Sequence, residues 1–391
     1  MRPGVSEMQF DFATAGRVLF GPGTLRQAAP LAAEIGKRAL VVTGSKPERA
    51  AELLASMAEE GIAPVTYAVS GEPTLDTARE AIALARENRC DLVIGFGGGS
   101  ALDTGKSVAA VLANGGDPLD YAEVVGRGKK LTRPSAPFIA IPTTAGTGAE
   151  VTRNAVLASP EHRVKASLRS LGMLPTLAIV DPDLTLGLPP EPTASSGLDA
   201  LTQLIEPFLT TRANPLTDGL CREGIRRVAR SLRRAYENGS DAEARQDMAL
   251  ASLMGGMALS NAGLAAVHAL AGPFGGMFPA PHGATCASLL PAAMEVNLRA
   301  AQARQPGGEF LRRCEEVARI LTGRPEATAE DGVVWIRELC RALNVRPLRA
   351  YGLTEAEIPG LVERSKATSS MKANPVALTD EEIREIVVRS A

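Results

Sequence analysis

The stretch DLVIGFGGGSALDTGKSVAAVLAN, residues 91–114, decides the fold of this chain. It joins a short apolar run, Asp91–Phe96, to three consecutive glycines, a serine and a helical pattern, Ala101–Asn114. A buried strand that passes through a tight turn into a helix is typical of a parallel sheet with helices on both faces. We therefore expect an α/β fold built on an open, mostly parallel sheet.

The same alternation continues on both sides of this stretch, and it stops near residue 192. We expect a strand or hairpin at residues 9–20, strands at 38–43, 65–69, 138–142 and 177–180, and helices at 24–35, 47–60 and 74–88. After residue 192 only helical patterns follow, at 215–238, 241–262, 284–302, 309–321 and 331–343. The chain is long enough for two domains. We place an α/β domain at 1–190 and an all-helical domain at 191–391.

The composition excludes several classes of partner. Lys and Arg number 42 against 44 Asp and Glu in 391 residues, and both signs are interspersed, which argues against nucleic acid and anionic membranes. The five cysteines lack C-x-x-C spacing, so a disulfide framework is not expected. The opening MRPGVSEMQF has no apolar core for a signal peptide, and no run of about 18 apolar residues follows. We expect a soluble cytoplasmic protein.

Two glycine-rich loops follow neighbouring strands. Ligands of parallel sheets bind beyond the carboxyl ends of the strands. Gly97, Gly98 and Gly99 before Ser100 allow backbone N–H groups to approach an anion at a helix N-terminus. An ordinary tight turn is the alternative, but three consecutive glycines are costly in chain entropy. A P-loop is excluded, because five residues separate Gly99 from Gly105 where that motif has four.

The second loop, PTTAGTGAE at 142–150, offers the hydroxyls of Thr143, Thr144 and Thr147 beside two more glycines. A dinucleotide carries two phosphates and two riboses, and it needs several such loops side by side. Two loops on consecutive strands therefore favour dinucleotide binding over a single phosphate.

Histidine is scarce, and its position is informative. Two of the three histidines, His268 and His282, lie within 267–291, and Asp199 and Gln203 are four residues apart on one predicted helix face. A carboxylate, an amide oxygen and two imidazoles would suit a divalent transition metal with an open position. Taken singly, each residue is also explained as a helix-start Asp, a polar-face Gln or a core His. We favour the metal site.

The segments GGGSALDTGK, IPTTAGTGAEVT, GLDALTQLIEPF and VHALAGPFGGMFPAPHG together resemble the iron-containing (group III) alcohol dehydrogenase family. That family includes maleylacetate reductases and short-chain diol and aldehyde reductases. The resemblance implies a dehydroquinate synthase-like architecture, NAD(P) and a metal in the cleft between two domains, a small alcohol or carbonyl substrate, and a homodimer or larger homo-oligomer.

The resemblance also implies roles for individual residues. The pyrophosphate is expected at Gly97, Gly98, Gly99 and Ser100 with Asp103 in the same corner, and the ribose beside Thr143, Thr144, Thr147 and Lys165. The family's metal ligands, one Asp and three His, fall on Asp199, Gln203, His268 and His282, so Gln203 replaces a histidine. A further family histidine near the nicotinamide falls on Gly272. Lys165 and His268 are the expected catalytic residues, and Fe²⁺ or Zn²⁺ the expected ion.

The loop after the strand at 38–43 bears on the choice of coenzyme. An acidic residue near the end of an early strand often binds the ribose 2′-hydroxyl and repels a 2′-phosphate. Here the strand is followed by Gly44, Ser45 and Lys46, with no acid and a cation close by. We expect NADPH to be accepted at least as well as NADH.

These observations predict an NAD(P)-dependent alcohol dehydrogenase or aldehyde reductase. Two alternatives remain: a metal-independent reductase of the same fold, similar to maleylacetate reductases, and a degenerate nucleotide-binding sensor without turnover. We expect Leu264, Phe274 and Phe278 to shape an apolar substrate pocket. The arginines of Arg222–Arg234 are expected to form a solvated face or an oligomer contact.

Overall fold

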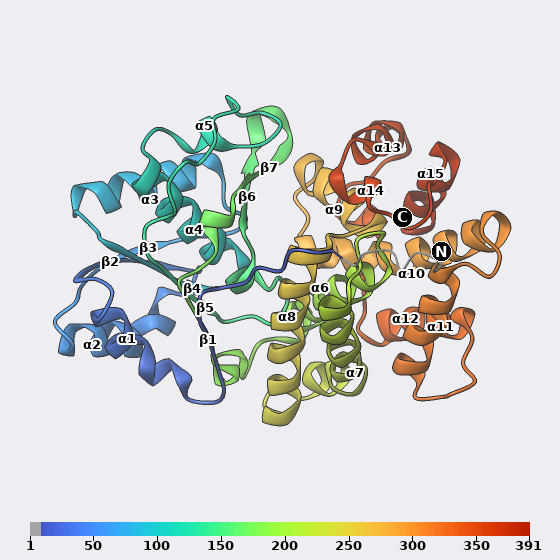
Figure 1. Ribbon diagram of the computed structural model, residues 1–391, viewed down its shortest axis with the longest axis horizontal. Helices are drawn as coiled ribbons and strands as arrows, with labels where there is room; N and C mark the ends of the chain where they lie inside the picture. Colours follow the sequence, from blue (N-terminus) through green and yellow to red (C-terminus); the bar gives the residue numbers. More distant parts are fainter. Residues whose placement is uncertain (1–8) are drawn as a thin grey trace, which may run out of the picture.

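The computed structural model describes residues 9–391 as a sheet with its helices beside a compact array of further helices (Figure 1). The sheet has six strands in the order β1-β8-β5-β4-β2-β3, and every neighbouring pair is parallel. The strands are β1 (Val18–Phe20), β2 (Arg38–Thr43), β3 (Ala63–Ala68), β4 (Leu92–Gly97), β5 (Phe138–Pro142) and β8 (Leu177–Val180). The expected open parallel sheet is confirmed.

Helices cover both faces of the sheet, because alternate side chains of each strand point to opposite sides. In β2, Ala39 and Val41 pack with α1 (Ala28–Ala33) and α2 (Ala51–Glu59). The intervening Leu40 and Val42 pack with α3 (Leu75–Glu87) and α4 (Gly99–Asn114). The short helix α5 (Pro118–Tyr121) follows α4. Because all six strands are parallel, their carboxyl ends lie at one edge of the sheet, and the glycine loops follow β4 and β5 at that edge.

The N-terminal expectation was wrong over most of its length. Only Val18–Phe20 of residues 9–20 form a strand, and β1 is the edge of the sheet, so no further strand lies there to pair with the preceding residues. Instead, the Ala13 N–H donates to the Asn261 side chain of the helical region at 2.7 Å. The stretch that argues against a signal peptide begins outside the described residues.

Sequence patterns also missed an antiparallel hairpin, β6 (Asn154–Ser159) and β7 (Val164–Arg169). It lies apart from the main sheet, between the sheet and α9 (Figure 1). The apolar run of β6 is only four residues long, Ala155–Ala158, and β7 mixes Lys165 and Arg169 with small residues, which is why the sequence gave no clear strand pattern.

From Pro190 onward the described chain contains helices and no strand. Helix α6 is central: it is buried from Gly197 to Leu209 and packs against α7, α8 and α10. The helices are α6 (Pro190–Leu209), α7 (Pro215–Glu237), α8 (Ala242–Ala262), α9 (Ala266–Met277), α10 (His282–Arg304), α11 (Glu309–Thr322), α12 (Ala329–Ala342), α13 (Ile358–Lys366), α14 (Ser369–Lys372) and α15 (Asp380–Arg389). The predicted division of the chain at residue 190 stays a prediction.

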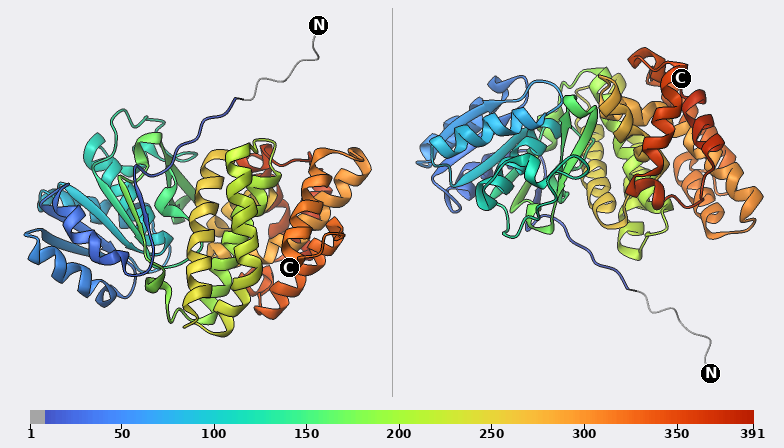
Figure 2. Two further views of the ribbon diagram at one scale, coloured as in Figure 1. Left: turned by 60° about the horizontal axis from the view of Figure 1, so that its bottom comes forward. Right: turned by 90° about the horizontal axis from the view of Figure 1, so that it is seen from above.

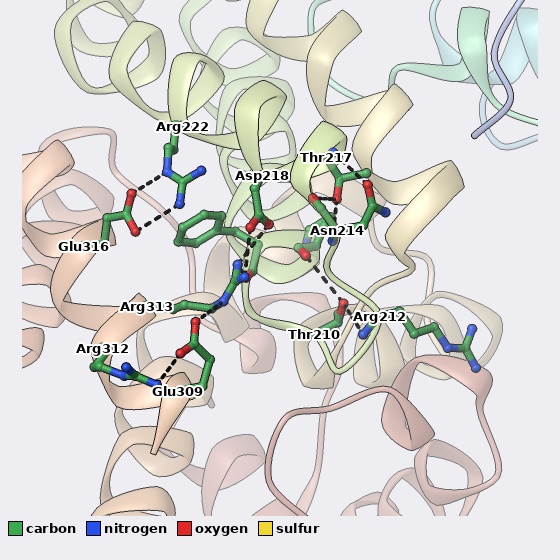
Figure 3. Close-up of polar contacts among 12 residues, drawn as sticks. Thr210, Arg212, Asn214, Thr217, Asp218, Arg222, Glu309, Arg312, Arg313 and Glu316 are labelled. Atoms are coloured by element: carbon green, nitrogen blue, oxygen red, sulfur yellow. Dashed lines mark hydrogen bonds and ion pairs between the residues drawn. The ribbon is translucent and has the colours of Figure 1, made fainter. Parts of the chain in front are cut away.

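The arginines of α7 hold neighbouring helices together within the chain. Arg222 pairs with Glu316 of α11, and Arg313 of α11 pairs with Asp218 of α7 at 2.8 Å (Figure 3). Both guanidinium groups lie over the Phe208 ring, at 5.0 and 4.8 Å from its centroid. The interpretation as a solvated face or oligomer contact therefore misses their use in packing.

Within residues 9–391, no single helix has the length and apolar character needed to cross a membrane. The pair α8 and α9 satisfies the length and composition criteria only when joined, and it is bent by 97°.

Candidate active site

A cleft of about 530 Å³ separates the carboxyl edge of the sheet from the helical region. It brings together residues that the sequence analysis drew from distant segments. The predicted residues that line it are Gly98, Gly99, Ser100, Asp103, Thr144, Thr147, Lys165, Asp199, Gln203, His268 and His282. The remaining candidates, Gly44, Ser45, Lys46, Gly97 and Thr143, are not among its lining residues.

The glycines of the first loop leave room for neighbouring side chains; at Gly98 the backbone angles are not ones that only glycine allows. Gly98 has an extended conformation, φ −76° and ψ −171°, that any residue can adopt. A Cβ atom at Gly98 would lie 3.3 Å from Thr144 Oγ1, and one at Gly99 would lie 3.0 Å from Thr147 Cγ2. A Cβ at Gly97 would lie 2.7 Å from Cβ of Ala101. Gly98 and Gly99 therefore pack against Thr144 and Thr147 of the second loop, so the two loops are close enough to contact one ligand.

Helix α4 begins in this loop, and no side chain within the described chain caps its N-terminus. The backbone N–H groups of the first turn of a helix lack intrahelical partners, and the helix dipole favours negative charge there. Thr143 donates its N–H to the Gly97 carbonyl at 2.9 Å, which aligns the ends of β4 and β5. The arrangement fits a phosphate group at the edge of the cleft.

Asp103 and Lys106 form an ion pair on α4 that also contacts the hairpin. Lys106 Nζ lies 3.0 Å from Asp103 Oδ1 and 2.9 Å from Thr152 Oγ1, and the Val156 N–H donates to Asp103 Oδ2 at 3.0 Å. The Gly-Lys-Ser sequence that resembles a P-loop ending thus ties α4 to the hairpin. Both carboxylate oxygens of Asp103 have protein partners, so its direct contact with a coenzyme stays a prediction.

Lys165 reaches the cleft from β7. Its Nζ pairs with Glu72 Oε2 at 2.9 Å, and its side chain is only 7% exposed. Its Cε would lie 2.8 Å from a Cβ atom on Gly275 of α9, so the hairpin rests against the helical region there. The missed hairpin is therefore the element that places Lys165 in the cleft.

The proposed metal ligands converge from three helices. Asp199 and Gln203 lie one turn apart on α6, His268 lies on α9, and His282 is the first residue of α10. Asp199 Oδ1 lies 3.5 Å from His268 Nε2 and 3.9 Å from His282 Nε2. Asp199 Oδ1 and Gln203 Oε1 are buried, and neither has a hydrogen-bond partner in the described chain. Such unpaired oxygens are costly without a counter-charge, so these residues fit a cation.

Glu206, which the sequence analysis did not single out, orients the His268 ring. Its Oε2 lies 2.7 Å from His268 Nδ1, and its Oε1 accepts the Val267 N–H at 2.7 Å. A carboxylate on one ring nitrogen directs the other nitrogen toward a metal. The signal was present in the sequence, because Glu206 follows Asp199 by seven residues and so lies on the same helix face.

The family models agree with this geometry. Residues 15–182 match the model of iron-containing alcohol dehydrogenase, and residues 193–391 match that of the Fe-containing alcohol dehydrogenase family, C-terminal. The chain belongs to the iron-containing alcohol dehydrogenase family. It is thus an oxidoreductase that acts on CH–OH groups, and metal and NAD binding are typical of its family.

Individual relatives cover nearly the whole chain. Alcohol dehydrogenase 4 of Schizosaccharomyces pombe is 35% identical over 374 residues, which span 94% of this chain and 86% of that protein. The crystal structure of a 1,3-propanediol oxidoreductase superposes with a TM-score of 0.90 at 32% identity, covering 98% and 100%. The sulfoacetaldehyde reductase of Bifidobacterium kashiwanohense, in complex with NAD⁺, gives a TM-score of 0.84 at 29% identity, covering 97% and 98%.

A cysteine lies among the candidate metal ligands. Ligand atoms of Asp199, His268, His282 and Cys286 all lie within 4.8 Å of one another. Burial raises the pKa of the Cys286 thiol, but the two imidazoles outweigh it and lower that pKa overall. Burial lowers the pKa of each imidazole, but Cys286 and Asp199 outweigh it and raise both. The sequence signal, His-x₃-Cys at the start of a helix, was overlooked.

Two aromatic residues that we expected in the wall of the cleft do not line it. Leu264 lines the cleft of this dehydrogenase, but Phe274 and Phe278 do not. Their rings stack on each other with centroids 4.7 Å apart, and Phe274 is fully buried in the helical core. Gly272, where the family has a histidine, lines the cleft, and a Cβ atom there would meet nothing within 4 Å. The wall is therefore open at that position.

Proposed function

We propose that this alcohol dehydrogenase transfers hydride between NAD(P) and a small alcohol or carbonyl compound, with a divalent metal, Fe²⁺ or Zn²⁺, in the cleft. The carrying observation is that one cleft holds both the uncapped N-terminus of α4 and the Asp199, His268 and His282 cluster. The 1,3-propanediol and sulfoacetaldehyde enzymes among the relatives support a short-chain substrate.

The proposed roles follow from position. Gly97, Gly98, Gly99 and Ser100 bind the pyrophosphate, with Asp103, Thr143, Thr144 and Thr147 beside it, and Asp199, Gln203, His268 and His282 hold the ion. When bound, the coenzyme supplies the hydride and the ion supplies positive charge that polarises the substrate carbonyl. Glu206 keeps the His268 ring turned so that Nε2 faces the cluster. Lys165 holds positive charge at the nicotinamide side of the cleft, balanced by Glu72.

We further propose that NADPH is accepted at least as well as NADH. A Cβ atom at Gly44 would meet nothing within 4 Å, which leaves room beside Ser45 and Lys46 for a 2′-phosphate. The Lys46 ammonium would attract that phosphate.

We also propose a homodimer or larger assembly. Residues 9–12 extend away from the body of the chain (Figure 2), and Phe10 on this arm is 43% exposed. An extended arm with an exposed aromatic side chain is suited to packing on a second copy. Light scattering gives the oligomer size directly.

The function is tested with purified protein loaded with Fe²⁺ or with Zn²⁺, supplied with NADPH or NADH and a panel of short-chain aldehydes. We expect coenzyme oxidation that a chelator abolishes and added metal restores. Coenzyme binding, seen by NADPH fluorescence, without turnover on any aldehyde would favour the sensor alternative. Full turnover of metal-free protein, unaffected by His268→Ala, would favour the metal-independent reductase.

A further inference from the structure

Cys286 lies one helical turn after His282 on α10, and it is fully buried beside the candidate ligands Asp199 and His268. Its Sγ is 3.7 Å from Nε2 of His268 and 3.7 Å from Nε2 of His282. We propose that Cys286 is a thiolate ligand of the metal, that it strengthens a ligand set in which Gln203 offers only a weak amide oxygen, and that it gives the site a preference for zinc over iron. The inference rests on the proposed metal-dependent function.

The spacing of the donor atoms matches a tetrahedral site. Typical zinc–sulfur and zinc–nitrogen distances place a thiolate and an imidazole about 3.6 Å apart at two corners of a tetrahedron. Both Cys286–imidazole distances are 3.7 Å. The same reasoning gives about 3.4 Å between a carboxylate oxygen and an imidazole nitrogen. The Asp199–His268 distance is 3.5 Å and the Asp199–His282 distance is 3.9 Å.

Neutral side chains alone do not satisfy the donors and acceptors of the cluster. The His268 ring directs Nδ1 at Glu206, so its neutral form presents an unprotonated Nε2 to the unpartnered Asp199 Oδ1. Two acceptors then face each other. The Cys286 thiol has one hydrogen and can satisfy only one of the two imidazoles. A charged His268 would pair only with Asp199 and Glu206, whereas one divalent cation would serve Asp199, both imidazoles and Cys286 together.

The chemistry of the donors indicates which metal. Gln203 offers a neutral amide oxygen, which is a weak donor compared with an imidazole. A thiolate is a soft donor that favours zinc, and with Asp199 it gives the site two negative charges. Zinc also accommodates a fifth ligand, so four protein donors leave the substrate able to approach.

The experiment uses cobalt as a spectroscopic substitute in the full-length protein. Co²⁺ bound to a thiolate gives a near-ultraviolet sulfur-to-metal absorption band that nitrogen and oxygen ligands do not give. We expect this band in the wild type, its loss in Cys286→Ser, and its retention in Cys340→Ser. Cys340 is a matched control, since it is also buried in the helical region but its Sγ contacts the Ala287 carbonyl.

Metal retention provides a second readout. Against a competing chelator, we expect Cys286→Ser to hold Zn²⁺ at least about 100-fold more weakly than the wild type, because loss of a ligand exceeds the usual cost of losing a group that only orients one. The double variant Gln203→His with Cys286→Ala has one Asp and three His, and we expect its preference to shift toward Fe²⁺.

Cobalt that binds to the wild type without the band overturns the inference, as does a band that persists in Cys286→Ser or a protein that binds none of the three metals. The spectrum is recorded without coenzyme or substrate. An active enzyme without the band would therefore refute only the role of Cys286, whereas a band in a protein that turns over no aldehyde would refute only the proposed function.

Discussion

The two halves of the cleft are built in different ways. The proposed phosphate site at Gly97, Gly98 and Gly99 consists of consecutive residues and would present backbone N–H groups, so it depends on the absence of side chains. The proposed metal site consists of side chains from α6, α9 and α10, so it depends on which donors the folded helices bring together. A backbone site is therefore intolerant of any Cβ atom, whereas a side-chain site can exchange one donor for another. In the proposed site, Gln203 and Cys286 would be such an exchange.

The largest expected effect comes from removing a ligand of the proposed metal site. We expect His268→Ala to lower turnover by more than about 100-fold and to release the metal, because it removes a strong donor and leaves Glu206 and Asp199 buried without their partner. Gln203→Ala should cost less than about tenfold, because it removes a weak neutral donor. Steady-state kinetics with metal analysis of both variants checks the order. Equal losses would contradict our ranking of the ligands.

The next largest effect is expected from adding a side chain to the glycine loop. We expect Gly98→Val to weaken NADPH binding by about 100-fold or more, because its side chain would crowd Thr144 and block the approach of phosphate to the N–H groups. The fold should survive, since the loop lies at a strand end. Fluorescence titration and circular dichroism measure the two effects. Gly219→Val, on the exposed face of α7 where an added Cβ meets nothing, is the control. Unchanged affinity in Gly98→Val would place the phosphates elsewhere.

A smaller effect sharpens the comparison by adding a side chain to the coenzyme half without blocking it. Gly44→Asp has room for its Cβ, so we expect altered preference rather than lost binding. The new carboxylate should favour NADH over NADPH by about tenfold relative to the wild type, through repulsion of the 2′-phosphate. The ratio of kcat/KM for the two coenzymes gives the answer. Wild-type protein that ignores NADPH would show that this loop does not contact the ribose.

The last effect is on stability rather than on turnover or binding, and it concerns Glu150, which follows the second glycine loop. Burial raises the pKa of its carboxyl group from 4.5 to about 7, although the Lys106 charge opposes this. Between these values the unfolded chain releases the proton while the folded chain keeps it, so stability falls as pH rises and the full loss is present above pH 7. The loss is on the order of 3 kcal/mol. Glu150→Gln should flatten the fall in Tm between pH 5 and pH 8. An unchanged slope would show that Glu150 does not cause it.

The limits of the sequence analysis follow the same division. The sheet, the strands Arg38–Thr43 and Phe138–Pro142 and the position of the glycine loop were predictable, because each depends on contiguous residues with a clear period. The hairpin β6–β7 was not, because its strands have at most a four-residue apolar run and are held by contacts with α4 and α9. The Arg222 and Arg230 side chains are partly solvent-facing, as expected, but the sequence could not show that they also pair with Glu316 and Asp247, because these partners lie on other helices.

By itself, the sequence determined the parallel α/β sheet, the helical second half, the family, and the candidates Asp199, Gln203, His268 and His282. These rest on local periodicity and on short motifs, which need no knowledge of distant contacts. Only the tertiary structure decided that Glu206 orients His268, that Lys165 pairs with Glu72, and that Cys286 faces both imidazoles. Each of these depends on how helices or strands far apart in the chain pack, and the packing of the whole core sets their relative positions.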